Sequence, residues 1–304
     1  MRYLLRRTIH ALGVMLGVVV IVFFAGRLLG DPVRIVAGVE ASEERLEVIR
    51  ESLNLDKPIL IQFGIFLTNV LRGDFGNSFW QKRPVTSLVL ERIPATLYLT
   101  GVALLIAVPA AILLGAMAAL KPRSFADRAI RIISLGGVSV VDFWLGLMLI
   151  LLFAVQLGWF KTSGYGGIQY VILPALTLAY RPLGTISQIT RSAMLDELSK
   201  PYVKAARAKG LSGTRVIFDH ALKNAAIPIV TIAGIALTSL LNGAIVVETV
   251  FGWPGIGLLS IQALERRDLP LIEGTVFFVA LTVVVTNLAV DFAYTYLNPK
   301  IRLS

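Results

Sequence analysis

The stretch PYVKAARAKG, residues 201–210, is a basic segment between apolar segments. It carries Lys204, Arg207 and Lys209 within six residues, whereas the segments on either side are apolar enough to cross a lipid bilayer. Pro201 suits the first turn of a helix, and Gly210 suits the position just after one. The stretch therefore predicts a helix of about two turns, displayed on one side of a membrane.

The composition indicates a membrane protein with several spans. Of 304 residues, 56% are hydrophobic and 16% are charged, and the mean hydropathy is +0.77. A soluble domain has about 45–50% apolar and about 25% charged residues. The absence of cysteine excludes disulfides, thiolate metal sites and cysteine nucleophiles. The net charge of +10 fits the Lys and Arg that membrane proteins collect in cytoplasmic loops, so no nucleic acid is expected as a partner.

Six transmembrane helices are expected. Arg2, Arg6 and Arg7 precede the first of them, and no small-residue cleavage pattern follows it, so it is expected to be an uncleaved span rather than a signal peptide. Arg181 and Pro182 interrupt the fourth. The expected spans are His10–Leu29, Ala95–Leu120, Ile133–Leu157, Tyr170–Ile189, Ile227–Val250 and Gly274–Leu297.

The distribution of charge predicts the orientation. With the N-terminus inside, the inner segments hold 16 basic and four acidic residues, whereas the outer stretch 27–92 holds nine of each. This asymmetry predicts six spans with both ends cytoplasmic. Three parts are expected: residues 1–30 with the first span, an extracytoplasmic segment 31–93, and a five-helix core 94–298 that contains a cytoplasmic loop 191–227.

The segment 31–93 is too long for a plain connection. SEERLEVIRESLNL predicts an amphipathic helix with Ser42 as its N-cap and Leu46, Ile49 and Leu53 on one face. PILIQFGIFLTNVLRG is apolar but short, and it predicts an interfacial or packed helix rather than a seventh span.

The sequence lacks several familiar kinds of catalytic motif. It contains no GxxxxGK[ST], HExxH or GxSxG, and its two histidines, His10 and His220, lie on different segments. Neither a catalytic site nor a metal site is therefore expected. Related halves with matching broken helices, typical of a secondary transporter, are not visible. Four charged residues at membrane depth are candidates for contact with a substrate or for pairing between helices: Asp142, Arg181, Glu248 and Asp291.

The loop 191–227 contains features that a signal for membrane topology does not require. Ala205, Ala206 and Ala208 make one flank of the short helix small, so a partner's surface could approach closely. Ser212 can cap a second helix, TRVIFDHALKNA, in which Val216, Ile217, Ala221 and Leu222 are expected to face apolar surroundings. A solvated basic loop that only sets topology requires Lys and Arg alone. The alanine flank followed by glycine favours a docking helix.

At these residues the chain resembles the coupling loop of ABC transporter permeases, whose pattern is Glu-Ala-Ala, three residues, Gly, then Ile-x-Leu-Pro. Ala205, Ala206, Gly210 and Leu222 match, while Lys204 replaces the Glu. YVKAARAKGLS and HALKNAAIPIVT resemble the variant of the dipeptide/oligopeptide/nickel group. The resemblance continues through GDP at 30–32, LNLDKP at 53–58, GDFGNS at 73–78, RIPATLYLT at 92–100, ILPALTLA at 172–179, GAIVVETVFGWPGIG at 243–257, RRDLP at 266–270 and LNPKI at 297–301.

The resemblance implies an all-α, polytopic permease of the type I ABC importer fold, with an extracytoplasmic helical insertion after the first span, as in the first permease of such systems. It implies a homologous second permease, two ABC ATPase subunits that hold ATP and Mg, an extracytoplasmic binding protein, and a bacterial plasma membrane. No cofactor is expected on this chain. The residues expected to dock on an ATPase are Tyr202, Lys204, Ala205, Ala206, Arg207, Gly210 and Leu222.

An outer loop and the cargo leave alternatives open. Trp253, Pro254 and Gly255 form either an aromatic interfacial anchor with a tight re-entry, or a gate or contact for the binding protein. Peptides are the first expectation for the cargo. Glutathione, opines, oligosaccharides and nickel are alternatives, as is a membrane scaffold or sensor that transports nothing.

Overall fold

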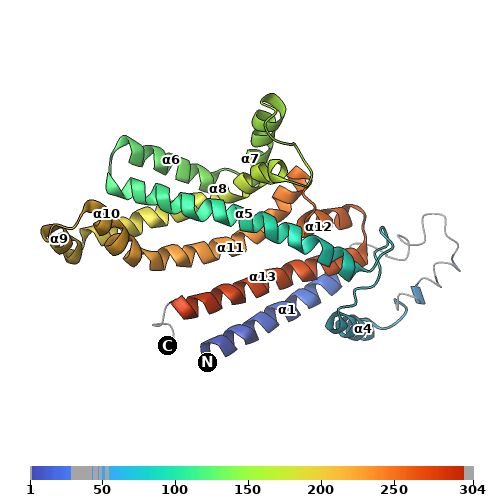
Figure 1. The fold of residues 1–304 in the computed structure, drawn as a ribbon. Helices are drawn as coiled ribbons and strands as arrows, with labels where there is room; N and C mark the ends of the chain where they lie inside the picture. The colour runs from blue at the N-terminus through green and yellow to red at the C-terminus, as the bar shows by residue number, and fades with distance from the viewer. Residues whose placement is uncertain (1, 29–42, 44–46, 48–49, 52–54, 298–304) are drawn as a thin grey trace. The chain divides into compact units, whose positions relative to one another are not determined.

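Helices make up the regular structure of the chain in the computed structural model, which describes residues 2–28, 43, 47, 50–51 and 55–297 (Figure 1). Within these residues the β-structure is limited to one isolated bridge between Asn77 and Pro84. The expected cap Ser42, the helix face of Leu46, Ile49 and Leu53, the GDP motif and most of LNPKI lie outside the described residues.

The chain divides into two compact units, of which the first comprises residues 1–95 and 254–289. The short apolar helix after the first span is present and packed: it ends at Gly73, which adopts φ +72°, and its residues Phe63 and Phe66 lie against Phe23 at ring-centroid distances of 5.1 and 5.5 Å. The helices of this unit are α1 (Arg2–Leu28), α4 (Ile59–Arg72), the first turns of α5 (Val85–Leu120), α12 (Ile256–Glu265) and most of α13 (Leu269–Leu297).

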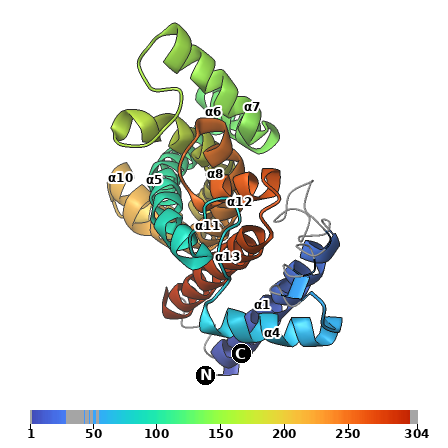
Figure 2. The ribbon, with the colours of Figure 1, turned by 90° about the vertical axis from the view of Figure 1, so that its right-hand side faces the viewer.

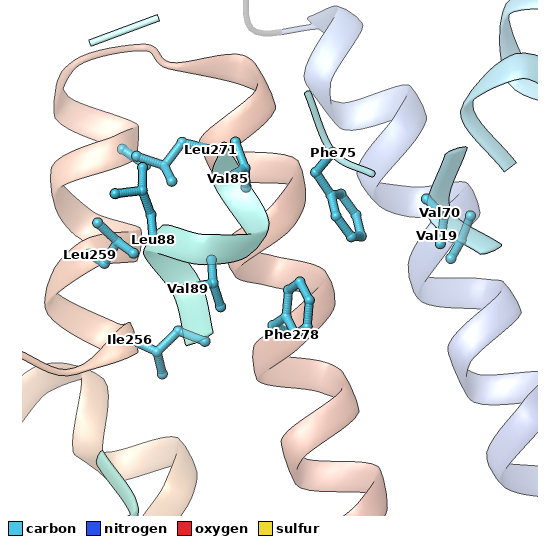
Figure 3. Close-up of a cluster of buried hydrophobic side chains, with 11 residues drawn as sticks. Val19, Val70, Phe75, Val85, Leu88, Val89, Ile256, Leu259, Leu271 and Phe278 are labelled. Atoms are coloured by element: carbon cyan, nitrogen blue, oxygen red, sulfur yellow. The ribbon is translucent and has the colours of Figure 1, made fainter. Parts of the chain in front are cut away.

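An apolar core holds the first unit together (Figure 3). Val85 and Val89 at the start of α5 point toward Leu271 and Phe278 of α13, and Phe75 packs its ring on Phe278 at 5.5 Å. Residues four apart lie on one face of a helix, so the beginning of α5 presents an apolar stripe to α12 and α13. This burial ties segments far apart in the sequence into one body.

Asp268 fastens the loop 73–82 to the start of α13. Its carboxylate is buried and accepts hydrogen bonds from the Ser78 hydroxyl at 2.6 Å and from the Trp80 N–H at 2.9 Å. It also accepts the Leu271 N–H at 3.3 Å, as an acidic residue before a helix does. The GDFGNS and RRDLP motifs therefore meet in the structure.

The second unit comprises residues 96–253 and 290–304 and carries most of the membrane core. Helix α8 lies between α6 and α11 and contacts both (Figure 2). Helix α5 packs against α8 and α11 through a shared apolar cluster. The elements of this unit are the rest of α5, α6 (Phe125–Ser139), α7 (Asp142–Leu149), a π-helix η1 (Ile150–Gln156), α8 (Ile168–Ser199), α9 (Pro201–Ala208), α10 (Gly213–Arg215), a π-helix η2 (Val216–Leu222) and α11 (Lys223–Phe251).

Glycines let α6 and α8 touch backbone to backbone. The space where Gly184 would carry a Cβ is taken by the Ser134 carbonyl oxygen and, 3.3 Å away, by the Gly137 Cα. The equivalent space at Gly137 is taken by the Tyr180 carbonyl oxygen. Small residues at helix contacts are the usual means of association in a membrane, because lipid tails supply no hydrophobic drive between apolar helices. The crossing is therefore specified by these two glycines.

The predicted spans and the structural helices agree in part. Among the described residues, four helices are long and apolar enough to cross a membrane, or five if a bent pair counts as one span. The fourth predicted span is one continuous helix, α8, in spite of Pro174, Arg181 and Pro182, but its polar residues keep it out of that set. The chain is a multi-pass membrane protein, and the number of six crossings stays a prediction.

The third predicted span, Ile133–Leu157, is wrong as a straight helix. The chain bends by 112° between α6 and α7 (Figure 1). Val140 and Val141 are extended, with ψ angles of 136° and 133°, and so interrupt the helix. β-Branched valines adopt extended backbone readily, and hydropathy alone does not register a bend.

Replacing Gly184 with alanine tests the crossing of α6 and α8. The added Cβ meets backbone atoms that cannot rotate away, so we expect Gly184→Ala to lower the stability of the detergent-purified protein by about 1–3 kcal/mol, as overpacking does. Thermal unfolding would measure the change. Gly101→Ala is the matched control, because a Cβ at this helical glycine meets nothing within 4 Å. Equal melting of Gly184→Ala and Gly101→Ala would contradict the proposed crossing.

Candidate functional site

The predicted two-turn helix is present with the predicted ends. Helix α9 begins at Pro201 and ends at Ala208, and Gly210 follows it with φ +79°, a conformation that glycine adopts at little cost. The Leu211 N–H donates back to the Ala206 carbonyl at 3.3 Å, which closes the helix end. Ser212 then caps the next helix by accepting the Arg215 N–H. Local sequence thus determines both turns of the loop.

The alanines of α9 do not share one environment: some face the rest of the loop and others face outward. Val203 and Ala206 are buried against Val216, whereas Lys204 and Ala205 are exposed. Residues three apart share a helix face, so Ala206 follows Val203 inward. The expectation that Ala206 offers its surface to a partner is wrong: its small side chain lets α9 approach η2 of the same chain. Ala205 keeps the outward position, and the side chain of Arg207 lies outside the described part of the structure.

Tyr202 joins three elements of this loop. Its hydroxyl donates to Glu197 at the end of α8, at 2.6 Å, and accepts from the Asn224 amide of α11, at 3.0 Å. Burial and the neighbouring Glu197 raise the pKa of Tyr202, so the hydroxyl keeps its proton. Hydrogen bonds from Lys200 and Tyr202 lower the pKa of Glu197, which is therefore a charged acceptor at neutral pH. Tyr202 is 37% exposed, so its ring is both a brace and part of the surface.

Leu222 also belongs to the chain's own core. It lies half-buried in a cluster of α5, α8 and α11 that includes Ile186, Met194 and Ala225. The π-helix η2 therefore turns Leu222 toward the spans, and the structure does not present this side chain for direct contact with a partner. The π-helix η2 thus contacts α9 as well as α8 and α11.

A buried ion pair near this loop escaped prediction. Asp127 of α6 is fully buried and receives two hydrogen bonds from Arg191 of α8, at 2.7 and 3.1 Å. The Arg123 N–H donates to the same carboxylate at 2.8 Å, and Arg131 lies 3.6 Å away. These arginines contribute to the count of positive charges that predicts topology. The Ser124–Asp127 spacing at a helix start could have indicated that Asp127 has a structural role.

Trp253 is 1% exposed, which corrects its prediction as an interfacial anchor. Its ring stacks on Tyr98 at 6.1 Å and meets Tyr165 edge-on at 4.8 Å, and Gly252, with φ +57°, ends α11 just before it. Aromatic rings gain from burial against one another, so the indole turns inward. A buried Trp253 is equally unsuited to be a surface contact for a binding protein. Pro254 is half-buried and Gly255 is buried, and their role stays a prediction.

The four charged candidates at membrane depth have different surroundings. Glu248 is fully buried and accepts a hydrogen bond from the Thr96 hydroxyl at 2.5 Å. Asp291 is half-buried on α13. Asp142 and Arg181 form an ion pair at 3.6 Å, and both reach a pocket. Within the described residues no group of three or more His, Cys, Asp or Glu side chains could hold a metal ion.

Comparison with known proteins finds matches to one family of transport proteins along nearly the whole chain. Residues 111–303 match the model of the binding-protein-dependent transport system inner membrane component, and residues 1–100 match the model of its N-terminal part. A glutathione transport system permease protein, GsiC of Salmonella choleraesuis, is 40% identical over 99% of both chains. A putative peptide transport system permease protein of Brucella abortus is 38% identical over 98% of both chains.

Solved structures support the fold. The inward-facing MetNI methionine ABC transporter contains a chain with a TM-score of 0.56 and 17% identity, which covers 69% of this chain and 96% of that one. An amino acid ABC transporter crystallised with histidines gives a TM-score of 0.53 and 19% identity, covering 71% of this chain and 94% of that one. The helical core found here is therefore an ABC transporter permease fold.

The orientation of α9 can be tested with two neighbouring alanines. We expect Ala206→Leu to loosen the loop, because the larger side chain does not fit beside Val203 and Val216, and Ala205→Leu to leave the loop intact, because Ala205 is exposed. Limited trypsin digestion would report this, since Lys204 and Lys209 are cleavage sites. Faster cleavage of Ala205→Leu than of Ala206→Leu would show that the inward face is assigned to the wrong residue.

Proposed function

Because this chain belongs to the family of binding-protein-dependent transport system inner membrane components, we propose that it forms half of the path by which peptides enter the cell through an ABC importer. Similarity to permeases named for peptide and glutathione transport, over 98–99% of each chain, supports this cargo. Glutathione is itself a small peptide. Opines, oligosaccharides or nickel as cargo, and a scaffold or sensor role, remain the alternatives.

The proposed assembly contains four chains in addition to this one: a homologous second permease, two ABC ATPases and the extracytoplasmic binding protein. Permeases of ABC importers act together with ATPase and substrate-binding partners, and the ATPases use ATP and Mg. In the proposal this chain carries no catalytic site and binds no cofactor. It lies in the bacterial plasma membrane with both termini cytoplasmic, in agreement with the 16 basic residues of the inner segments.

The observation that carries the proposal is the way α9 is held. Tyr202 links it to α8 and α11, and Val203 and Ala206 pack it on η2. A surface element with this many connections to the spans cannot move alone. In the proposal, an ATPase grips α9, and closure of the ATPase pair moves α8 and α11. Nucleotide can drive such a change only through unequal affinity for the two conformations.

The proposed docking face consists of the outward residues of α9. Lys204, Ala205 and Lys209 are exposed, and Ala205 has the smallest side chain of the three. Lys204, Lys209 and the sequence-predicted Arg207 would face acidic groups of the ATPase. Exposed ion pairs contribute only about 0–1 kcal/mol each, so we expect shape at Ala205 to matter more than any single charge.

Gly210→Pro tests the coupling. Proline requires φ near −65°, whereas Gly210 has φ +79°, so the turn after α9 cannot form. We expect this variant to reach the membrane, to lose peptide uptake, and to hydrolyse ATP without the normal dependence on substrate-loaded binding protein. Uptake and ATP hydrolysis in proteoliposomes with the complete complex would measure both effects.

Gly213→Pro is the matched control for this test. Gly213 is the first residue of α10, a position where proline is favoured, and Ser212 before it is already extended. We expect nearly normal uptake from this variant. Normal uptake by Gly210→Pro would contradict the coupling role, and purification of the chain without any ATPase would favour a scaffold.

A further inference from the structure

A pocket of about 200 Å³ lies inside the second unit, where α7, α8 and α11 meet. Its polar lining comes from Asp142 at the start of α7, Arg181 in the middle of α8, and Ser239 and Asn242 on α11. Leu178 and Leu240 supply apolar walls. Two opposite charges and two neutral polar groups thus converge on one space.

The position of these groups in the chain places the pocket deep in the membrane. Ser239 and Asn242 fall near the middle of the apolar stretch 227–250, far from either end of α11. Both are exposed in the chain, as is Arg181. A charged or amide side chain at this depth is costly against lipid, so such residues face a water-filled path or a protein neighbour. The face that carries the pocket is therefore directed to the path or to a protein neighbour, not to lipid.

The ion pair itself is loose. A single contact of 3.6 Å joins Arg181 Nε to Asp142 Oδ1, whereas Arg191 holds Asp127 with two hydrogen bonds of 2.7 and 3.1 Å. The side chain of Arg181 is 44% exposed and that of Asp142 is 21% exposed, compared with a fully buried Asp127. An arginine that only fastens two helices is expected to use its two-pronged geometry. The Asp142–Arg181 pair leaves that geometry available for another partner.

From this arrangement we propose that the pocket is a transit site for the charged ends of a zwitterionic peptide. Asp142 binds the α-ammonium group, Arg181 binds the α-carboxylate, and the Asn242 amide and the Ser239 hydroxyl bind the peptide bond. In the empty site the two side chains neutralise each other, and in the filled site each neutralises one end of the ligand. Net charge in the pocket stays at zero, which avoids placing an uncompensated charge at membrane depth.

Gly243 keeps space beside the carboxylate. A Cβ at this position would lie 3.2 Å from Leu178 Cδ1 and 3.7 Å from Asp142 Oδ2. A larger side chain here would therefore occupy the place where the ammonium group is proposed to bind. This inference rests on the proposed function, because it assumes that the cargo of the importer is a peptide.

The test is binding of three radiolabelled probes to the complete transporter in nanodiscs without the binding protein: dialanine, N-acetyl-dialanine and dialanine amide. We expect Asp142→Asn and Arg181→Gln each to weaken dialanine binding about tenfold, as expected for loss of a charge-assisted contact. Asp142→Asn should not change the binding of the acetylated probe, which lacks the ammonium group. Arg181→Gln should not change that of the amide, which lacks the carboxylate. Asp56→Asn and Arg128→Gln, both at exposed positions, are the matched controls.

Three outcomes would overturn the site: no binding of dialanine by the wild-type complex, unchanged binding in both variants, or an equal loss of all three probes, which a merely structural ion pair predicts. Peptide uptake by the wild-type complex with its binding protein is measured separately. Uptake together with any of these three outcomes removes the transit site and leaves the proposed function standing. Absence of peptide uptake removes the proposed cargo and the site with it.

Discussion

The close contact between α6 and α8 is the constraint on which the second unit depends. Gly137 and Gly184 let the two backbones meet, and polar contacts then secure the crossing along its length: the Tyr180 hydroxyl donates to the Ile133 carbonyl at 3.0 Å, and Ser134 bonds Ser187 at 3.2 Å. The buried Asp127–Arg191 pair closes one end. In lipid, where apolar surfaces do not drive helices together, contacts of this kind supply the association.

The position of α8 explains how two distant sites can be related. Arg181 lies on the pocket in the middle of this helix, and Glu197 lies near its end, where it accepts the hydroxyl of Tyr202 from α9. Helix α8 is continuous between these two residues, across Pro182, and it packs against α6 and α11. In the proposed function, a displacement of α9 and a rearrangement at the pocket are thus two results of one movement of α8.

The sequence predicted the local features well, because each depends on a few neighbouring residues. Pro201 and Gly210 bound α9, Ser212 caps α10, and Val216, Ile217, Ala221 and Leu222 become buried or half-buried as expected. The features that the sequence did not predict depend on which parts of the folded chain pack against one another. Hydropathy does not register the bend at Val140 and Val141, and the type of residue at Trp253 does not say whether the ring meets lipid or Tyr165.

The sequence by itself determined that this is a multi-pass membrane chain with a short, basic, glycine-terminated helix, because composition, hydrophobic length and turn chemistry are properties of the chain alone. Only the tertiary structure decided that Ala206 and Leu222 face inward, that Tyr202 is a brace, and that Asp142 and Arg181 share a pocket with Asn242. Which face of a helix is covered depends on the helices that pack against it, and one sequence read along its length does not contain that information.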